Sequence, residues 1–222
     1  MKAYTLDIIK KNRVIAVIRL NESRKILKIV EALMKGGIKC LEITYTVPDA
    51  LKIIKEISEN IGQDFKVGAG TVLNSEIARA AIYAGAEFIV APNTNYKVIN
   101  VCKKYDKVII PGAFTPTEIF NAWEKGADIV KVFPARYFGP KYFVDIKGPY
   151  PQINLMPTGG VSIENAADFI RSGAYAVSIG RDLLNNDAIE KDKFDIITEN
   201  AKRLVEKINE VKEVKNENNN II

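Results

Sequence analysis

Two charged residues stand inside runs that otherwise read as buried strands, and together they could carry out carbonyl chemistry. Lys131 interrupts an apolar run at residues 128–134, and Glu42 interrupts another at residues 40–46. An amine that is partly withdrawn from water gives up its proton more easily, and the neutral amine is a nucleophile for a carbonyl carbon. A carboxylate beside it could move the protons that such a reaction requires.

The alternation of side chains along a strand predicts where these groups point. A period of two places Glu42 on one face with Cys40, Thr44 and Thr46, while the intervening residues are apolar or aromatic and suit packing against helices. The same reasoning places Lys131 on one face with Phe133. A buried Glu42–Lys131 ion pair with a purely structural role is the alternative, but such pairs often fail to offset their desolvation.

Composition removes several other kinds of chemistry. The 222 residues include no histidine and two cysteines. Ser-His-Asp and Cys-His mechanisms and histidine-containing zinc sites are therefore excluded, and Cys40 and Cys102 are too far apart in the chain for a thiolate cluster. We expect two reduced, buried thiols, no metal and no cofactor. Acid–base work then falls to Glu, Asp, Lys or Tyr.

The charge and hydropathy patterns argue against nucleic-acid and membrane partners. The chain has 32 Lys+Arg and 27 Asp+Glu, a net charge of +5, but no clustered basic stripe with interleaved aromatics, so no nucleic-acid partner is expected. No apolar run approaches the roughly 18 residues of a membrane span, and charged residues interrupt the first 20 positions. These features predict a soluble, cytoplasmic protein with no membrane partner.

Short β-branched runs alternate with amphipathic helical patterns along the chain. The predicted strands are 14–19, 40–45, 65–70, 88–91, 108–111, 129–133, 154–157 and 176–179. Eight such units predict a single α/β domain with a (β/α)8 (TIM) barrel at about residues 14–184. We also expect an N-terminal helix, a long C-terminal helix at about 190–214 and a polar tail at 215–222. An open doubly wound sheet is the alternative, although it usually has about five or six strands and its glycine-rich turn is missing after the first one.

Chemistry in a barrel sits at the carboxyl ends of the strands, and those ends carry suitable residues. Arg19 offers a positive charge, the turn at 68–71 offers close backbone approach and the Thr71 hydroxyl, and Pro92 and Phe133 offer apolar walls. Together they could hold a small keto acid. The turns at 157–162 and 179–181 occupy the loops where barrels commonly bind phosphate through backbone N–H groups.

Six segments resemble one family as a set. They are Leu41-Glu42-Ile43-Thr44, Val67 to Val72, Ile110-Pro111-Gly112, Val130-Lys131-Val132-Phe133-Pro134, Lys147-Gly148-Pro149 and Pro157-Thr158-Gly159-Gly160-Val161. In order and spacing, from about Ile8 to Leu184, they resemble the 2-keto-3-deoxy-6-phosphogluconate (KDPG) aldolases, a family that also includes 4-hydroxy-2-oxoglutarate aldolase activity.

The resemblance implies a metal-independent class I aldolase and a role for each matched position. Lys131 would form the Schiff base with the keto acid, and Glu42 would move protons through a water. Its remaining implied contacts are Arg19 with the carboxylate, Thr71, Pro92 and Phe133 with the pyruvate part, and Thr158, Gly159, Gly160, Gly180 and Arg181 around the phosphate end. The resemblance also implies a homotrimer.

Two positions depart from the family pattern. Thr46 stands where many members carry an arginine, and Arg181 stands where a serine often contacts phosphate. An arginine can make bidentate contacts with phosphate, so the second change bears on that end of the substrate. A galactonate-type substrate is the alternative within the family. Outside it, the alternatives are phosphate-binding barrel isomerases or synthases of the tryptophan or thiamine pathways, and a barrel that only binds a phosphorylated metabolite.

Overall fold

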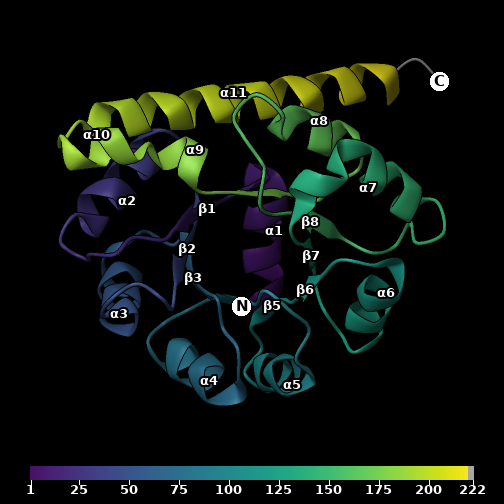
Figure 1. Cartoon of the computed structure of the whole chain (residues 1–222), viewed down its shortest axis with the longest axis horizontal. Coiled ribbons are helices and arrows are strands. Elements are labelled where there is room, and N and C mark those ends of the chain that lie inside the picture. The colour runs from purple at the N-terminus through teal and green to yellow at the C-terminus, as the bar shows by residue number, and fades with distance from the viewer. Residues whose placement is uncertain (220–222) are drawn as a thin grey trace.

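A computed structural model describes residues 1–219, with side chains described for residues 1–211. Its centre is a ring of parallel strands with helices around the outside (Figure 1). The strands are β1 (Val14–Ile18), β2 (Cys40–Thr44), β3 (Lys66–Gly70), β4 (Phe88–Val90), β5 (Val108–Ile110), β6 (Gly112–Ala113), β7 (Val130–Val132), β8 (Leu155–Pro157) and β9 (Val177–Ile179).

The ring is an eight-stranded barrel in which β5 and β6 form one strand that is interrupted at Pro111. One sheet has the order β5-β4-β3-β2-β1-β9 and the other has the order β6-β7-β8. The Lys131 N–H donates to the Pro111 carbonyl over 2.9 Å, and a parallel bridge between Thr158 and Ser178 joins β8 to β9. The (β/α)8 prediction is therefore confirmed. The open-sheet alternative is wrong, because the last strand, β9, pairs with the first strand, β1, and is bridged to β8 on its other side.

Helices cover the outer face of the ring, as the alternating pattern predicted. They are α2 (Ile26–Lys35), α3 (Ala50–Asn60), α4 (Ser75–Tyr83), α5 (Tyr96–Lys104), α6 (Pro116–Glu124), α7 (Gly139–Lys147) and α8 (Ala166–Arg171). A capping box starts α6: the Thr115 hydroxyl accepts from the Glu118 N–H, and the Glu118 carboxylate accepts from the Thr115 N–H. A short 3-10 helix, η1 (Ala135–Tyr137), follows β7.

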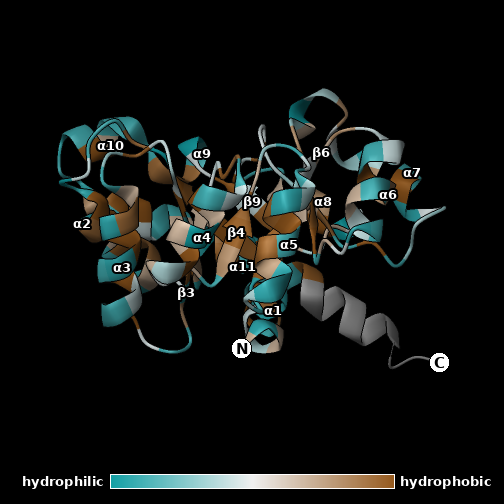
Figure 2. Cartoon of the chain, turned by 90° about the horizontal axis from the view of Figure 1, so that it is seen from below, coloured by the Kyte–Doolittle hydropathy of each residue, from teal (hydrophilic) through white to brown (hydrophobic). Residues whose placement is uncertain are grey.

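The amino end of the barrel is closed by α1 (Lys2–Asn12). Ile8 and Ile9 of this helix belong to the same buried cluster as inward-facing strand residues such as Phe88 and Val108. Figure 2 places α1 at one end of the barrel, while α9 and α10 lie towards the opposite end. Any pocket that reaches the barrel interior must therefore open at the carboxyl ends of the strands.

The C-terminal part contains three helices, and the last of them confirms the long C-terminal helix that the sequence predicted. They are α9 (Arg181–Leu184), α10 (Asn186–Glu190) and α11 (Phe194–Asn219). The chain turns between α10 and α11, where Asp192 has a positive φ of 55°. Helix α11 packs closely on α2, since a Cβ added to Gly36 would lie 2.3 Å from the Ala201 Cβ. It includes residues 215–219, which we expected to form a polar tail, and residues 220–222 lie outside the described part.

Burial confirms the predicted strand faces. Leu41 and Ile43 pack in the outer hydrophobic cluster with the helices, whereas Cys40 belongs to the interior cluster. Glu42 follows Cys40 by two residues, so it faces the interior as well. Among the helices described, none is both long enough and apolar enough to cross a membrane.

Candidate active site

A cavity of about 790 Å³ opens at the carboxyl ends of the strands. Its lining comes from β1, β2, β7 and β9 and from the segments that follow β1, β7, β8 and β9. The lining residues are Val17, Arg19, Glu42, Lys131, Phe133, Arg136, Thr158, Gly159, Gly160, Val161, Ser162, Ser178, Gly180, Arg181, Asp182, Leu184, Asn185 and Asn186. Both predicted catalytic residues are among them.

Glu42 lies on the inner face of β2 and is 1% exposed. Gly70 on the neighbouring strand makes room for its carboxylate, because a Cβ added there would lie 1.8 Å from Glu42 Oε1. Burial raises the pKa of Glu42, and the positive charges of Lys131 and Arg19 partly oppose that rise. Raising the pKa of a carboxyl group makes its protonated form more available as a general acid.

Lys131 lies on the inner face of β7 and is 4% exposed. Its Nζ is 4.9 Å from the centroid of the Phe133 ring. Burial lowers the pKa of Lys131, Glu42 opposes that decrease, and the charge of Arg19 adds to it. Ion pairs with both partners largely buried do occur within the described residues, as for Lys107 and Glu87, but none joins Lys131 to Glu42. The purely structural ion pair that we considered is therefore not present.

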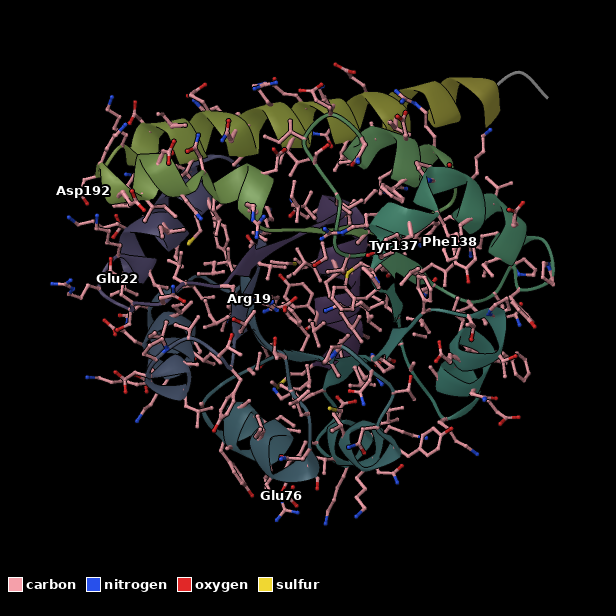
Figure 3. All side chains as sticks on the ribbon, viewed as in Figure 1. Arg19, Glu22, Glu76, Tyr137, Phe138 and Asp192 are labelled. Carbon is pink, nitrogen blue, oxygen red and sulfur yellow. The ribbon has the colours of Figure 1, made fainter. Side chains whose placement is uncertain are left out.

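A second positive charge lies at the end of β1. Arg19 donates through Nη2 to Thr71 Oγ1 over 3.2 Å. Figure 3 shows Arg19 within the ring of strands, whereas Glu22, Glu76 and Asp192 lie towards its periphery. Thr71 has a φ of 57°, a strained conformation for a β-branched residue, and such strain is concentrated at functional sites.

The loop after β8 brings two glycines to the other side of the cavity. Gly159 and Gly160 have φ values of 80° and 94°. A Cβ on Gly160 would lie 2.4 Å from the Arg136 Cβ, so only glycine fits beside η1 without displacement. Two later N–H groups of this loop are already occupied: Ser162 N–H donates to Asn165 Oδ1, and Ile163 N–H donates to Asp182 Oδ2.

Two arginines line the same side of the cavity. Arg181 begins α9, and Arg136 lies in η1 after β7. Within the described part of the chain, neither guanidinium has an acidic partner within ion-pair distance. Both charges therefore remain available to an anion. The sequence analysis missed Arg136, because it lies in an irregular segment where no periodicity predicts orientation.

Most of the predicted site residues meet in this cavity. Thr71 and Pro92 are absent from its lining among the described residues, although Thr71 is joined to it through Arg19. Pro92 supports the neighbouring backbone, since a Cβ on Gly112 would lie 2.2 Å from the Pro92 carbonyl oxygen. Thr46 shares a 2.9 Å hydrogen bond with Thr44 and is likewise outside the lining.

Three buried polar atoms are left without a hydrogen-bond partner, and all belong to cavity residues. They are Glu42 Oε2, Thr158 Oγ1 and Ser178 Oγ, which are the only such buried side-chain atoms within residues 1–211. An unpaired buried polar group costs about 1–3 kcal/mol, so native proteins retain few of them. Their concentration in one cavity indicates a ligand that completes their hydrogen bonds. Alternation along β9 with Gly180 could have identified Ser178 from the sequence.

The described side chains include no group of three or more Cys, Asp or Glu residues gathered as a metal site. The arrangement instead offers an amine with a lowered pKa, a buried carboxyl group near it, and positive charges on either side. Such a cavity can form a covalent adduct with a carbonyl compound whose two ends are anionic.

Comparison with known proteins gives a consistent result. A family model described as "KDPG and KHG aldolase" matches residues 6–200. A 2-dehydro-3-deoxy-phosphogluconate aldolase of Treponema pallidum is 36% identical over 165 residues, 74% of this chain and 78% of the relative. A 2-dehydro-3-deoxy-6-phosphogalactonate aldolase of Escherichia coli is 35% identical over 170 residues, 76% of this chain and 83% of the relative.

Solved structures agree with these relatives. A KDPG aldolase of Legionella pneumophila, with pyruvate captured as a covalent carbinolamine, superposes with a TM-score of 0.83 at 28% identity, covering 90% of this chain and 97% of that one. A designed protein cage, made by fusing symmetric oligomeric domains, superposes with a TM-score of 0.86 at 31% identity, covering 95% of this chain and 77% of that one.

Proposed function

This chain belongs to the KDPG and KHG aldolase family, and from that premise we propose that it is a metal-independent class I aldolase that acts through an imine on Lys131. The proposed reaction cleaves 2-dehydro-3-deoxy-6-phosphogluconate to pyruvate and D-glyceraldehyde 3-phosphate. The observation that carries the proposal is the Lys131 amine, 4% exposed, with a pKa lowered by burial, in one cavity with Glu42. The same chemistry would cleave 4-hydroxy-2-oxoglutarate to pyruvate and glyoxylate.

The reaction begins at the keto carbon of the substrate. Lys131 Nζ adds to this carbon and forms a carbinolamine. Glu42, through a water, supplies the proton with which the carbinolamine oxygen leaves as water, and an iminium ion remains. The C3–C4 bond then breaks: its electron pair enters the iminium system to give an enamine, while the C4 hydroxyl loses its proton to Glu42 and becomes the aldehyde. Protonation of the enamine carbon and addition of water release pyruvate and restore the amine.

The two ends of the substrate are held by different charges. Arg19, oriented by Thr71, binds the carboxylate, and Phe133 lines the pyruvate part with support from Pro92. At the other end, Gly159, Gly160 and Gly180 allow close approach of the phosphate to the backbone. Because Asn165 and Asp182 already occupy the Ser162 and Ile163 N–H groups, we assign the charge recognition there to Arg181.

Borohydride trapping with pyruvate tests the proposal directly. Reduction in the presence of pyruvate is expected to add one covalent adduct per chain, located at Lys131 by peptide mass spectrometry, because burial lowers the pKa of this amine and favours its neutral, nucleophilic form. Excess chelator should leave both trapping and cleavage unchanged. A chelator-sensitive enzyme without an adduct would contradict the proposal, and saturable metabolite binding without an adduct would favour a barrel that only binds.

A substrate panel tests the phosphate end. We expect kcat/KM to be highest for the phosphorylated sugar acids, and Arg181→Ser to reduce it by about 10- to 100-fold for them, in line with the loss of a charge-assisted contact. The value for 4-hydroxy-2-oxoglutarate, which has no phosphate, should change by less. Equal losses on all substrates would remove Arg181 from phosphate binding. The phosphogalactonate relative makes 2-dehydro-3-deoxy-6-phosphogalactonate the second candidate substrate in this panel.

Assembly and location form a smaller part of the proposal. We infer a homotrimer, for which the similarity to a domain used in a symmetric protein cage is the support. Light scattering of the purified chain would measure its mass in solution. We also infer a cytoplasmic location, since Cys40 and Cys102 are both free thiols.

A further inference from the structure

Ser178 is a buried polar residue that the mechanism above does not use. It lies on the inner face of β9, is 1% exposed, and its Oγ has no hydrogen-bond partner. The inward-facing residue two positions earlier is Ala176, which is fully buried in the apolar interior cluster. A small apolar residue would therefore satisfy packing at this end of β9, and the hydroxyl of Ser178 has no evident role in holding the fold.

A second unpaired hydroxyl lies beside it on the neighbouring strand. Thr158 and Ser178 are backbone partners in the bridge that joins β8 to β9, so both side chains belong to the same face of the barrel wall. Thr158 Oγ1 is also buried and without a partner. Each hydroxyl can both donate and accept a hydrogen bond, which is what the recognition of another hydroxyl requires.

Strand register places this hydroxyl pair between the two ends of the cavity. Lys131 pairs with Met156, which is one inward-facing position before Thr158 on β8. Gly159 and Gly160 follow Thr158 directly, and Gly180 and Arg181 follow Ser178 by two and three residues. Along the strands, the hydroxyl pair therefore lies closer to the carboxyl ends than Lys131 does, and it precedes the residues assigned to the phosphate.

We propose that Ser178, together with Thr158, binds the hydroxyl groups of the substrate carbons that lie between the imine carbon and the distal anion. This inference rests on the proposed function and deepens it: it makes Ser178 a specificity-determining residue that reads the hydroxylated aldehyde half of the substrate. The pyruvate half, which reacts with Lys131, carries no such hydroxyl group. An aldol substrate always carries at least one such hydroxyl, on the carbon that becomes the aldehyde.

Ser178→Ala separates this role from the others. With pyruvate alone, borohydride trapping at Lys131 should match the unmodified protein within about twofold, because pyruvate lacks the hydroxylated carbons. For cleavage of the hydroxylated sugar acids, kcat/KM should fall by roughly 5- to 100-fold, the range expected when a hydrogen-bonded partner is left unpaired. The preference between the gluconate-type and galactonate-type substrates should change as well, since they differ at one hydroxyl-bearing carbon.

The melting temperature distinguishes a substrate contact from a structural one. Since the Ser178 hydroxyl has no partner in the free protein, Ser178→Ala should be at least as stable as the unmodified chain. Ser178→Cys, which keeps the size but donates weakly, should show the same kinetic loss. Thr5→Val is the matched control: Thr5 is fully buried at the opposite end of the barrel, and its replacement should leave kcat/KM unchanged.

Three results would overturn the inference. They are unchanged kcat/KM with every substrate, a loss of pyruvate trapping equal to the loss of cleavage, and a lower melting temperature that accounts for the lost activity. Failure of the proposed function is recognised separately, because it would appear as the absence of a pyruvate adduct in the unmodified protein.

Discussion

Lys131→Met should abolish cleavage while leaving the barrel folded. The variant lacks the only group that the proposed mechanism uses to bond the keto carbon, and removal of a nucleophile that acts as part of a unit lowers kcat by more than about 10⁴-fold. Methionine has a similar length and no charge, so it can occupy the interior position on β7. The measurement is kcat for cleavage by the purified variant, together with borohydride trapping, which should give no adduct.

The same substitution should increase the free energy of unfolding at neutral pH. A stability measurement can therefore test whether misfolding explains the loss of cleavage. Burial lowers the pKa of Lys131 in the folded state, whereas in the unfolded chain the lysine titrates near 10.4. The buried ammonium of Lys131 therefore lowers the free energy of unfolding. This cost is complete at pH values below the pKa of the folded state, and it disappears as the pH rises above the pKa of the unfolded state. The stability gain of the variant should be present at pH 6 and absent near pH 11. A less stable variant at pH 6, or residual turnover with an adduct elsewhere, would contradict this account.

Local chemistry explains why much of the fold could be predicted from the sequence. Fully buried parallel strands need continuous apolar runs, so charges at Glu42 and Lys131 stood out against them, and alternation gave their direction. The capping box at Thr115 is likewise encoded within a few residues, and the structure contains it. The Gly70 contact with Glu42 follows only from register, because the two residues lie on different strands.

The parts that could not be predicted depend on contacts between distant segments. The turn between α10 and α11 combines a local cap with a distant contact. Lys193 N–H donates to the Ala188 carbonyl around Asp192, which has a positive φ, and Lys25 forms an ion pair with Asp192 and donates to the Ile189 carbonyl. The entry of Arg136 into the cavity depends on Gly160, which comes from another loop. The Ser162 and Ile163 N–H groups donate to the side chains of Asn165 and Asp182, so they are not available to a phosphate as the sequence predicted. Only the folded structure shows these two hydrogen bonds.

Glu42→Gln should separate imine formation from turnover. Glutamine keeps the size of the side chain but cannot accept or deliver the proton, and the loss of a positioned acid–base group lowers kcat by about 100- to 10 000-fold. Pyruvate trapping at Lys131 should persist at a reduced rate, since the amine remains. Glu87→Gln is the control, because Glu87 is a partly buried carboxylate that pairs with Lys107 near the amino end of the barrel. Unchanged turnover in Glu42→Gln would remove this residue from the mechanism.

The pH dependence of pyruvate trapping should move in opposite directions in Glu42→Gln and Arg19→Gln. The negative charge of Glu42 raises the pKa of Lys131, and the positive charge of Arg19 lowers it. Because the neutral amine reacts, the trapping rate rises with pH through the pKa of Lys131, and this acidic limb should move to lower pH in Glu42→Gln and to higher pH in Arg19→Gln. Opposite movements in two variants of one cavity cannot arise from a general loss of stability. If both limbs moved in the same direction, direct charge coupling to the Lys131 amine would be the wrong explanation.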